Sequence, residues 1–374
     1  MFYKLMKKLC LPLVVITPLS SLLISCNKTE DITKIKIDFK TPWWEFKNDE
    51  RQLLKDNIQD EINNSIKNIN YQNIEIEINT NNSEDNIIVS NVASGKTDIG
   101  FCSIGSINSW SNDHQILPII QTQTNSFKWT DNWSNYQDGM INDPLFQTGQ
   151  EITDEINKYP KLTDDDFNGS VYESFYNFDK KVDFYRGMIL IYGTDEEIIA
   201  IKDSWKNRDW NSFREFGIIT GNTSSSGSFK SQASLLKKHF KNGFTTLLED
   251  INQNTNSYKV NGKGRDIGKD QKYHIAFDDE GSFAWTHNND NDYFNPKDPQ
   301  ASIEVLTVTE PLKYDVGIAS TKIPNYLIQP ITNAIINIYK NGLDTLGPRL
   351  GYNGYKIINN VQKEIFDKYR EVIF

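Results

Sequence analysis

Apolar and polar residues alternate with the two-residue period of a β-strand over residues 34–40 and 74–80. Between these segments, residues 49–69 place leucine and isoleucine at helical spacing among charged residues, which predicts an amphipathic helix. The series continues with helices over 83–93 and from residue 103, and with strands over 98–101 and 116–124. Alternating strands and helices of this kind predict a mostly parallel sheet wrapped by helices.

The rest of the chain predicts a second α/β series after a segment of different character. Residues 128–177 are rich in Trp, Asn and Asp and show little periodicity apart from a candidate helix over 149–158. Later strands are predicted over 186–193, 216–221, 273–278 and 303–310. Later helices are predicted over 195–206, 325–340 and 355–372. Residues 222–230 lead into a further predicted helix that extends to residue 240.

We interpret the second series as a lobe inserted within the first, because no Gly/Pro/Ser-rich linker cleanly divides the chain. The first lobe would comprise residues 34–124 and 309–374, and the second lobe residues 125–308. The chain then leaves the first lobe after residue 124 and returns over residues 303–318. This is the organisation of a solute-binding protein with two crossovers between its lobes.

The N-terminal residues predict export and a lipid anchor. Lys4, Lys7 and Lys8 precede an apolar stretch that ends at Ser25 and Cys26, which is typical of a secretory signal. Residues 23–26 resemble the lipobox of bacterial lipoproteins. We therefore expect a signal peptide over 1–25, acylation of Cys26 by a lipid such as palmitate, and a tether over 26–33 at the outer face of the cell membrane. The alternatives are an uncleaved anchor or a secreted protein without lipid, but the apolar stretch is short for a full span.

Composition narrows the class of protein further. The chain has 374 residues, of which 12% are aromatic and 37% hydrophobic, so we expect a packed core and no polytopic membrane protein. A net charge of -10 offers no general attraction to nucleic acid. With Cys10 in the signal and Cys26 acylated, Cys102 remains alone, which leaves no intrachain disulfide and no cysteine-based zinc site.

Residues 223–230 form a serine-rich segment between a predicted strand and a predicted helix. Free backbone N–H groups and the positive end of a helix attract anions at such a position. Serine hydroxyls add donors, and a glycine lets the backbone approach a ligand closely. The segment resembles the phosphate loop of phosphonate-binding proteins, and the alternative is a flexible turn with a serine N-cap. Its candidate phosphate contacts are Ser224, Ser225, Ser226, Gly227 and Ser228.

Several long segments are similar to one protein family. They span residues 124–127, 182–190, 209–219, 239–248, 274–288, 314–317 and 347–356. They resemble the extracytoplasmic thiamine-binding lipoproteins of small wall-less bacteria, the Cypl-type high-affinity transport lipoproteins, over most of the chain from about residue 46. The resemblance implies a type II periplasmic-binding-protein fold with two α/β lobes, two crossover strands and a ligand cleft. It also implies delivery to the permease subunits of an ABC importer, with thiamine or thiamine pyrophosphate as the transported ligand.

A thiamine ligand would need aromatic surfaces for its thiazolium cation and a carboxylate for its aminopyrimidine. Trp43 and Trp44 follow the first predicted strand, where an α/β sheet opens onto its cleft. Further candidates lie beside later strands or near the crossover, or belong to a family segment: Tyr185, Arg186, Trp285, Tyr314, Asn125 and Ser126. Each aromatic residue could instead pack in the core. The carboxylate candidates are Asp278, Asp279, Glu280 and Asp315, of which we select Asp278, Glu280 and Asp315.

Signals for catalysis are weak. The four histidines show no metal-ligand spacing, and no nucleophile elbow or dinucleotide fingerprint occurs. One alternative is a thiaminase-like enzyme with Cys102 as its nucleophile, although no paired base can be named. Another is a surface adhesin, which would leave the serine segment and the aromatic set unexplained. We therefore predict a monomeric, lipid-anchored receptor that is not an enzyme, has no metal and no catalytic cofactor, and does not bind nucleic acid.

Overall fold

The computed structural model describes residues 34–40, 47–67, 74–82, 84–110, 115–129, 132–159, 164–241, 243–287 and 293–373. The expected signal peptide, the tether, Cys26, Trp43 and Trp44 lie outside these residues. Residues from Thr33 to Phe374 form one compact unit. In the described part of the chain, no helix is both long and apolar enough to cross a bilayer.

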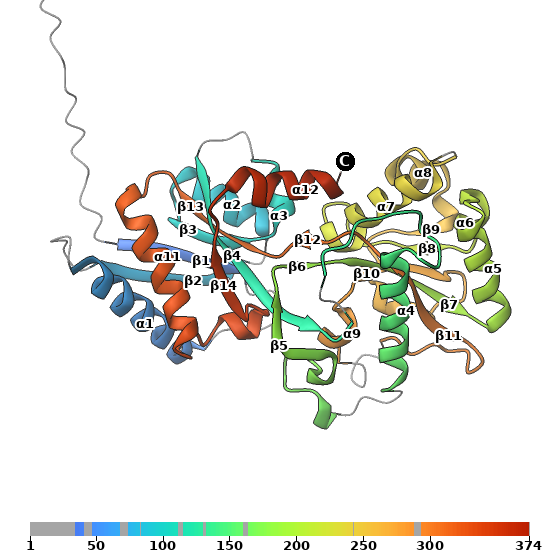
Figure 1. The fold of residues 1–374 in the computed structure, drawn as a ribbon, viewed down its shortest axis with the longest axis horizontal. Coiled ribbons are helices and arrows are strands. Elements are labelled where there is room, and N and C mark those ends of the chain that lie inside the picture. Colours follow the sequence, from blue (N-terminus) through green and yellow to red (C-terminus); the bar gives the residue numbers. More distant parts are fainter. Residues whose placement is uncertain are drawn as a thin grey trace, which may run out of the picture. The chain divides into compact units, whose positions relative to one another are not determined.

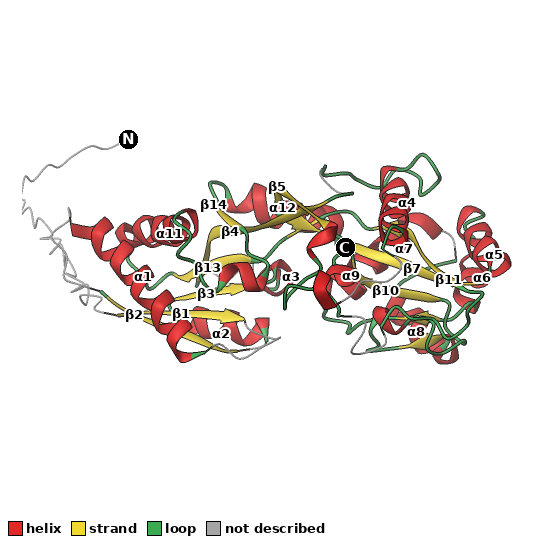
Figure 2. Cartoon of the chain, turned by 90° about the horizontal axis from the view of Figure 1, so that it is seen from below, coloured by secondary structure: helices red, strands yellow, loops and turns green. Residues whose placement is uncertain are grey.

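One sheet has seven strands, which carry the labels β1 to β5, β13 and β14 in Figure 1. Its path runs β14–β4–β13–β3–β1–β2, and β5 pairs with β4 beside this path. The strands are β1 (Lys34–Lys40), β2 (Glu75–Asn82), β3 (Ile99–Cys102), β4 (Ile116–Phe127), β5 (Tyr176–Val182), β13 (Val316–Ser320) and β14 (Gly354–Ile357). Its helices are α1 (Asn48–Ile66), α2 (Asp85–Ser94), α3 (Ile104–Asn108), α11 (Asn325–Lys340) and α12 (Asp367–Val372), and α1 packs against α11 (Figure 2).

The other large sheet has five strands in the order β11–β7–β10–β8–β9. They are β7 (Gly187–Gly193), β8 (Ile218–Ile219), β9 (Tyr258–Lys259), β10 (Ile275–Asp279) and β11 (Ser302–Val308). The accompanying helices are α4 (Pro144–Asn157), α5 (Asp195–Lys206), α6 (Trp210–Glu215), α7 (Ser231–Phe240), α8 (Leu247–Gln253) and α9 (Ser282–Trp285). A π-helical turn, η4 (Ser226–Lys230), leads into α7. The described 3-10 turns include η6 (Gly264–Asp266) and η7 (Gly347–Leu350).

A two-stranded ladder joins the two sheets. Strand β6 (Phe184–Tyr185) lies between β5 and β7 in the chain, and β12 (Leu312–Lys313) lies between β11 and β13. They pair antiparallel, with Tyr185 opposite Leu312. The fold is therefore the expected type II arrangement, in which two α/β lobes are joined by two crossover strands.

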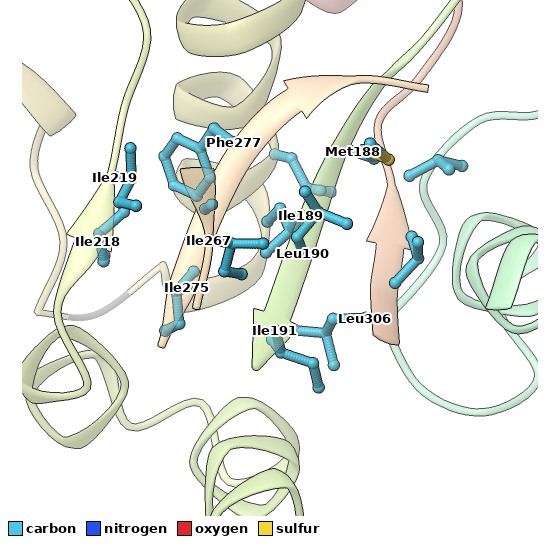
Figure 3. Close-up of a cluster of buried hydrophobic side chains, with 14 of the residues drawn as sticks. Met188, Ile189, Leu190, Ile191, Ile218, Ile219, Ile267, Ile275, Phe277 and Leu306 are labelled. Atoms are coloured by element: carbon cyan, nitrogen blue, oxygen red, sulfur yellow. The ribbon is translucent and has the colours of Figure 1, made fainter. Parts of the chain in front are cut away.

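The core of the five-stranded sheet is apolar on both faces. Every residue of β7 is buried, and Ile275 and Phe277 of β10 pack beside it (Figure 3). A continuous apolar run is what a strand covered on both faces requires. Burial of each such side chain contributes about 1.5–3 kcal/mol. The packed core of this sheet thus fixes the position of the carboxyl end of β10, where Asp278 and Asp279 lie.

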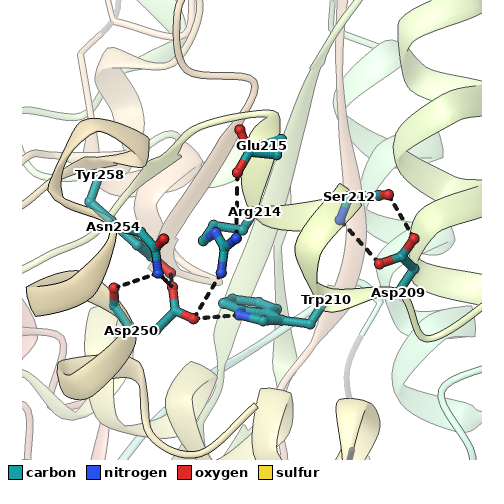
Figure 4. Close-up of polar contacts among 8 residues, drawn as sticks. All are labelled: Asp209, Trp210, Ser212, Arg214, Glu215, Asp250, Asn254 and Tyr258. Carbon is teal, nitrogen blue, oxygen red and sulfur yellow. Dashed lines mark hydrogen bonds and ion pairs between the residues drawn. The ribbon is translucent and has the colours of Figure 1, made fainter. Parts of the chain in front are cut away.

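A polar cluster beside this sheet ties three elements together (Figure 4). Asp250 of α8 accepts hydrogen bonds from Trp210 Nε1 at 2.7 Å and from Tyr258 OH at 2.7 Å. Arg214 Nη1 lies 3.2 Å from the same carboxylate. Because these partners come from α6 and β9 and are largely buried, we assign the cluster a structural role.

Two sequence predictions about the elements are wrong. The seven-stranded sheet is mixed: β1 pairs parallel with β2 and β3, but β13 pairs antiparallel with β3 and β4. The predicted helix over 355–372 begins instead with β14, in which Tyr355 pairs with Thr122, and helical structure starts only in the turn Gln362–Phe366. Pairing with a distant strand overrides the local spacing in this segment.

Helix α4 begins at Pro144, earlier than its apolar spacing predicts. The Asp143 side chain accepts from the backbone N–H of Leu145 at 2.8 Å, and proline suits the first helical position. The other Asp143 oxygen accepts from three backbone N–H groups of the preceding turn. A capping signal, not periodicity, sets this helix start.

Candidate ligand-binding site

A cavity of about 1220 Å³ lies where residues of both large sheets and of the crossover meet. Its lining includes Lys40 at the end of β1, Tyr185 of β6 and Asp279 at the end of β10. The serine segment forms another part of the wall. Small-molecule pockets usually measure about 300–1,000 Å³, so the space accommodates a complete small ligand together with water.

The structure places nine of the predicted contact residues on the cavity lining and five elsewhere. The nine are Tyr185, Ser224, Ser225, Ser226, Gly227, Glu280, Trp285, Tyr314 and Asp315. The five that do not line it are Asn125, Ser126, Arg186, Ser228 and Asp278. Trp43 and Trp44 fall outside the described residues.

A bulge explains why Asn125 and Ser126 are absent from the lining. The register of β4 against β5 shifts between these two residues, which breaks the regular alternation of side chains. Thr124 and Phe127 line the cavity instead. Ser126 is fully buried and its hydroxyl donates to the Phe127 carbonyl at 2.9 Å.

The serine segment is an ordered helix start. Ser225 is the N-cap of η4, and its Oγ accepts from the backbone N–H of Ser228 at 3.2 Å. The Ser228 hydroxyl also lies 2.8 Å from Ser225 Oγ, so Ser228 supports the segment from outside the cavity. The first N–H groups of a helix have no intrahelical acceptor, and those of Ser226 and Gly227 occupy this position. The segment therefore combines backbone donors with the positive end of a helix.

Lys230, at the end of η4, also lines the cavity. Its ammonium group has no hydrogen-bond or ion-pair partner within the described part of the chain. Burial lowers the pKa of Lys230 because a desolvated ammonium is less stable. Lys230 ends the serine-rich segment of the sequence, but it is not among the contacts predicted from the sequence. Lys230 thus adds a half-buried cation to the same cavity lining as the backbone donors, and such a group can attract an anion.

Two of the three consecutive carboxylates at the end of β10 and directly after it are held by protein groups. Asp278 Oδ2 accepts from the backbone N–H of Arg265 at 3.0 Å, and its Oδ1 accepts from the N–H of Asp279 at 2.9 Å. Glu280 Oε2 lies 3.5 Å from Arg186 Nη1, and Glu280 Oε1 accepts from the Arg186 backbone N–H at 2.9 Å. Arg186 and Asp278 thus support the site instead of facing it.

Asp279, between these two carboxylates, faces the cavity. Burial, followed by the negative charge of Asp278, raises the pKa of Asp279 to about 7. No hydrogen bond or ion pair reaches its carboxylate from the described residues. Asp279 is one of the four carboxylate candidates in the sequence, but its neighbours Asp278 and Glu280 are the predicted contacts. The direction in which each of these side chains points depends on how β10 packs, which the sequence does not show.

Asp315 is a second carboxylate on the cavity lining. Tyr352 OH donates to Asp315 Oδ2 at 2.7 Å. Burial, followed by the charge of Asp85, raises the pKa of Asp315 to about 6. Lys40 Nζ lies 3.2 Å from Asp85 Oδ1, so the negative charge of Asp85 is balanced by the ammonium group of Lys40. Lys40, Asp85 and Tyr352 line the cavity and were missed in the sequence, where nothing local distinguishes them.

Aromatic rings cover another part of the lining. The ring centroids of Tyr185 and Tyr314 lie 6.0 Å apart in an edge-to-face arrangement, and Tyr314 meets Tyr352 at 6.1 Å. Phe127 lies 4.7 Å from Tyr176, and both line the cavity together with Trp285. Aromatic side chains thus make up a substantial part of the cavity lining.

Cys102 is poorly suited to nucleophilic chemistry. It is fully buried and is absent from the cavity lining. Burial raises the pKa of its thiol well above the usual range, which disfavours the reactive thiolate. In the part of the chain that the structure covers, no group of three or more His, Cys, Asp or Glu side chains could hold a metal ion.

Comparison with known proteins finds similarity over most of the chain. The family model described as extracytoplasmic thiamine-binding lipoprotein matches residues 46–373. The high affinity transport system protein p37 of Mesomycoplasma hyorhinis is 42% identical over 274 residues, which cover 70% of this chain and 66%, just under two thirds, of that relative. The protein of the same name from Mycoplasma pneumoniae is 35% identical over 298 residues, covering 75% of this chain and 77% of the relative.

A solved structure agrees with these matches. Mh-p37 of Mycoplasma hyorhinis, for which a role in thiamine pyrophosphate transport has been suggested, superposes with a TM-score of 0.86 at 35% identity. The match covers 91% of this chain and 99% of Mh-p37. The two relatives are named as transport system proteins and not as enzymes. This chain therefore belongs to the family of extracytoplasmic thiamine-binding lipoproteins.

Proposed function

We propose that this protein is a lipid-anchored receptor that binds thiamine or thiamine pyrophosphate outside the cell and delivers it to the permease of an ABC importer. The two lobes expected from the sequence, residues 34–124 with 309–374 and residues 125–308, would close over the ligand. The observation that supports this best is a single cavity with both an anion site at the serine segment and a wall of aromatic rings and carboxylates. Those are the two kinds of surface that a phosphorylated thiamine needs.

The serine segment and Lys230 are the proposed phosphate end of the site. Phosphate oxygens accept from backbone N–H groups at a helix start and are attracted by the helix dipole. The Lys230 ammonium would gain the counter-charge that the described protein residues do not supply. Binding an anion thus offsets the desolvation of this lysine.

The rings and the carboxylates are the proposed thiamine end. A thiazolium cation is attracted to the face of Tyr or Trp rings by about 0.5–2 kcal/mol, which Tyr185, Tyr314 and Trp285 could provide. An aminopyrimidine donates hydrogen bonds, and Asp315 offers an acceptor on this lining. Trp43 and Trp44, which lie outside the described residues, remain predicted contacts of the ligand.

Calorimetric titration of the purified protein with thiamine and with thiamine pyrophosphate tests the proposal. We expect stoichiometric binding of at least the diphosphate and recovery of the intact ligand afterwards, identified by mass spectrometry. If neither compound binds, the ligand assignment is wrong.

We expect Lys230→Gln to weaken thiamine pyrophosphate about tenfold to a hundredfold and to leave thiamine nearly unchanged. Hydrogen bonds to charged groups contribute about 1.5–3 kcal/mol, and only the diphosphate presents oxygens to this lysine. The matched control is Lys237→Gln, because Lys237 is exposed on the following helix and does not line the cavity. Equal losses for both ligands would show that Lys230 acts through the fold and not through phosphate.

We expect wild-type protein to be labelled by a radioactive fatty acid and to partition into detergent, because the lipobox places the acylated thiol at Cys26. Cys26→Ser should lose the label, whereas Cys10→Ser, within the expected signal, should keep it. Equal labelling of the wild type and Cys26→Ser would contradict the lipid anchor.

A further inference from the structure

The carboxylate of Asp279 lies directly against the serine segment. A Cβ placed on Gly227 would lie 1.6 Å from Asp279 Oδ1, so the backbone of this glycine and the carboxylate are in contact. Both residues line the cavity. A phosphate held by the N–H groups of Ser226 and Gly227 would therefore lie beside a carboxylate.

Two anions at such close range repel each other unless a proton lies between them. The neighbouring carboxylates do not take the place of Asp279 beside the phosphate, because Asp278 and Glu280 already accept hydrogen bonds from the backbone N–H groups of Arg265 and Arg186. Asp279 has no protein partner within the described residues, so its oxygens are available to a ligand. Burial, followed by the charge of Asp278, also raises the pKa of Asp279 to about 7, so a fraction of this carboxyl group keeps its proton near neutral pH.

The charged and titratable groups around Asp279 come from several elements. On its own element, Asp278 and Glu280 favour the protonated form. Arg265 of η6 and Lys40 of β1 favour the charged form. Burial above all, and the charge of Asp279 in addition, raises the pKa of Tyr185 of β6 and of Tyr314 after β12, so both phenols stay neutral at physiological pH. Lys230 at the end of η4 is a further charged group on the same lining. The balance leaves Asp279 able to exchange a proton when a ligand arrives.

We propose that Asp279 and an oxygen of the ligand's phosphate share one proton, so that Asp279 is a specificity-determining residue for phosphorylated thiamine. This inference rests on the proposed function. The O–H group of one partner donates to the oxygen of the other, and no covalent bond forms or breaks. The contact would make the site accept a phosphate only together with its proton.

Proton sharing gives the two ligands different pH dependences. Above about pH 7 the free carboxylate and the free phosphate have both lost their protons, so binding must take one up from solvent. Affinity for thiamine pyrophosphate then falls by up to about tenfold per pH unit. Thiamine has no phosphate, and its cation favours the charged form of Asp279. Its affinity should therefore stay level or rise over the same range.

The test is calorimetric titration in metal-free buffer from about pH 6.5 to about pH 9, a range that spans the loss of both protons. Each titration is run in two buffers of different ionisation enthalpy, which measures the protons taken up. For thiamine pyrophosphate at high pH we expect the wild type to take up about one proton more than Asp279→Asn. Lys230, whose pKa burial lowers, is present in both proteins and does not contribute to this difference. The amide keeps a donor at every pH, so Asp279→Asn should bind the diphosphate more tightly than the wild type at the alkaline end.

Glu84→Gln is the matched control, because it removes the same charge from the cavity lining at the start of α2 and not at the end of β10. It should retain the wild-type proton uptake. The inference is overturned if wild-type binding of the diphosphate takes up no proton, if Asp279→Asn keeps the wild-type slope, or if thiamine shows the same fall with pH. If the wild type binds neither ligand, the proposed function is wrong and the inference falls with it. If the wild type binds thiamine pyrophosphate but takes up no proton, the proposed function stands and only the inference about Asp279 is wrong.

Discussion

Glu280→Gln should lower the free energy of unfolding by about 3–5 kcal/mol, because it leaves the guanidinium of Arg186 buried without its counter-charge. Both side chains are 2% exposed, and Arg186 Nη1 lies 3.5 Å from Glu280 Oε2. Arg186 Nη2 also donates to the Asn132 carbonyl at 2.6 Å, but a neutral carbonyl compensates the charge only in part.

Urea unfolding followed by circular dichroism measures this loss. The matched control is Glu371→Gln, which breaks the exposed pair with Lys368 at 2.8 Å and should cost no more than about 1 kcal/mol. A cost for Glu280→Gln similar to that of the control would mean that the buried pair is not held as described.

Gly227→Val should reduce the affinity for both thiamine and thiamine pyrophosphate by roughly fivefold to a hundredfold, since overpacking of this kind costs about 1–3 kcal/mol. Its Cβ would lie 1.6 Å from Asp279 Oδ1 and 3.0 Å from Tyr185 Cε2. The carboxylate would have to move into the cavity, and the two methyl groups beyond the Cβ would occupy space at the serine segment.

Titration of both ligands against the folded variant tests this, with the near-UV circular dichroism spectrum as a check on folding. Gly169→Ala is the control, because Gly169 also lines the cavity but a Cβ there meets no atom within 4 Å. Its positive φ of 93° predicts some loss of stability and only a small change in affinity. Unchanged affinity in Gly227→Val would contradict the assignment of this segment as a ligand wall.

Local signals predicted many elements well. The bounds of β1, α5 and α11 agree with the periodicity of the sequence. For α5 a capping box adds a sharp start, since Thr194 Oγ1 and Glu197 Oε2 each accept from the other residue's backbone N–H. Such signals act within a few residues, so they can be read without knowledge of the fold.

Non-local pairing decided the elements that were predicted wrongly. Strand β14 forms because Gly354 to Ile357 pair with β4, more than two hundred residues earlier in the chain. The parallel or antiparallel direction of each strand likewise depends on which strands become neighbours. The two-residue period of apolar residues indicates that a strand exists. It does not indicate the strand's direction, because side chains alternate between the two faces of the sheet in parallel and antiparallel pairs alike.

The sequence by itself determined that the chain alternates strands and helices and that a serine-rich helix start is present, because each depends on contiguous residues. The resemblance in its long segments pointed to the family that the comparisons show. Only the tertiary structure decided which side chains meet in the cavity. It turned Asn125 and Ser126 away through a bulge, paired Arg186 with Glu280, and set Asp279 against Gly227. The physical reason is that these contacts join residues tens to hundreds of positions apart, whose burial and charge depend on the packing of two sheets and not on their neighbours in sequence.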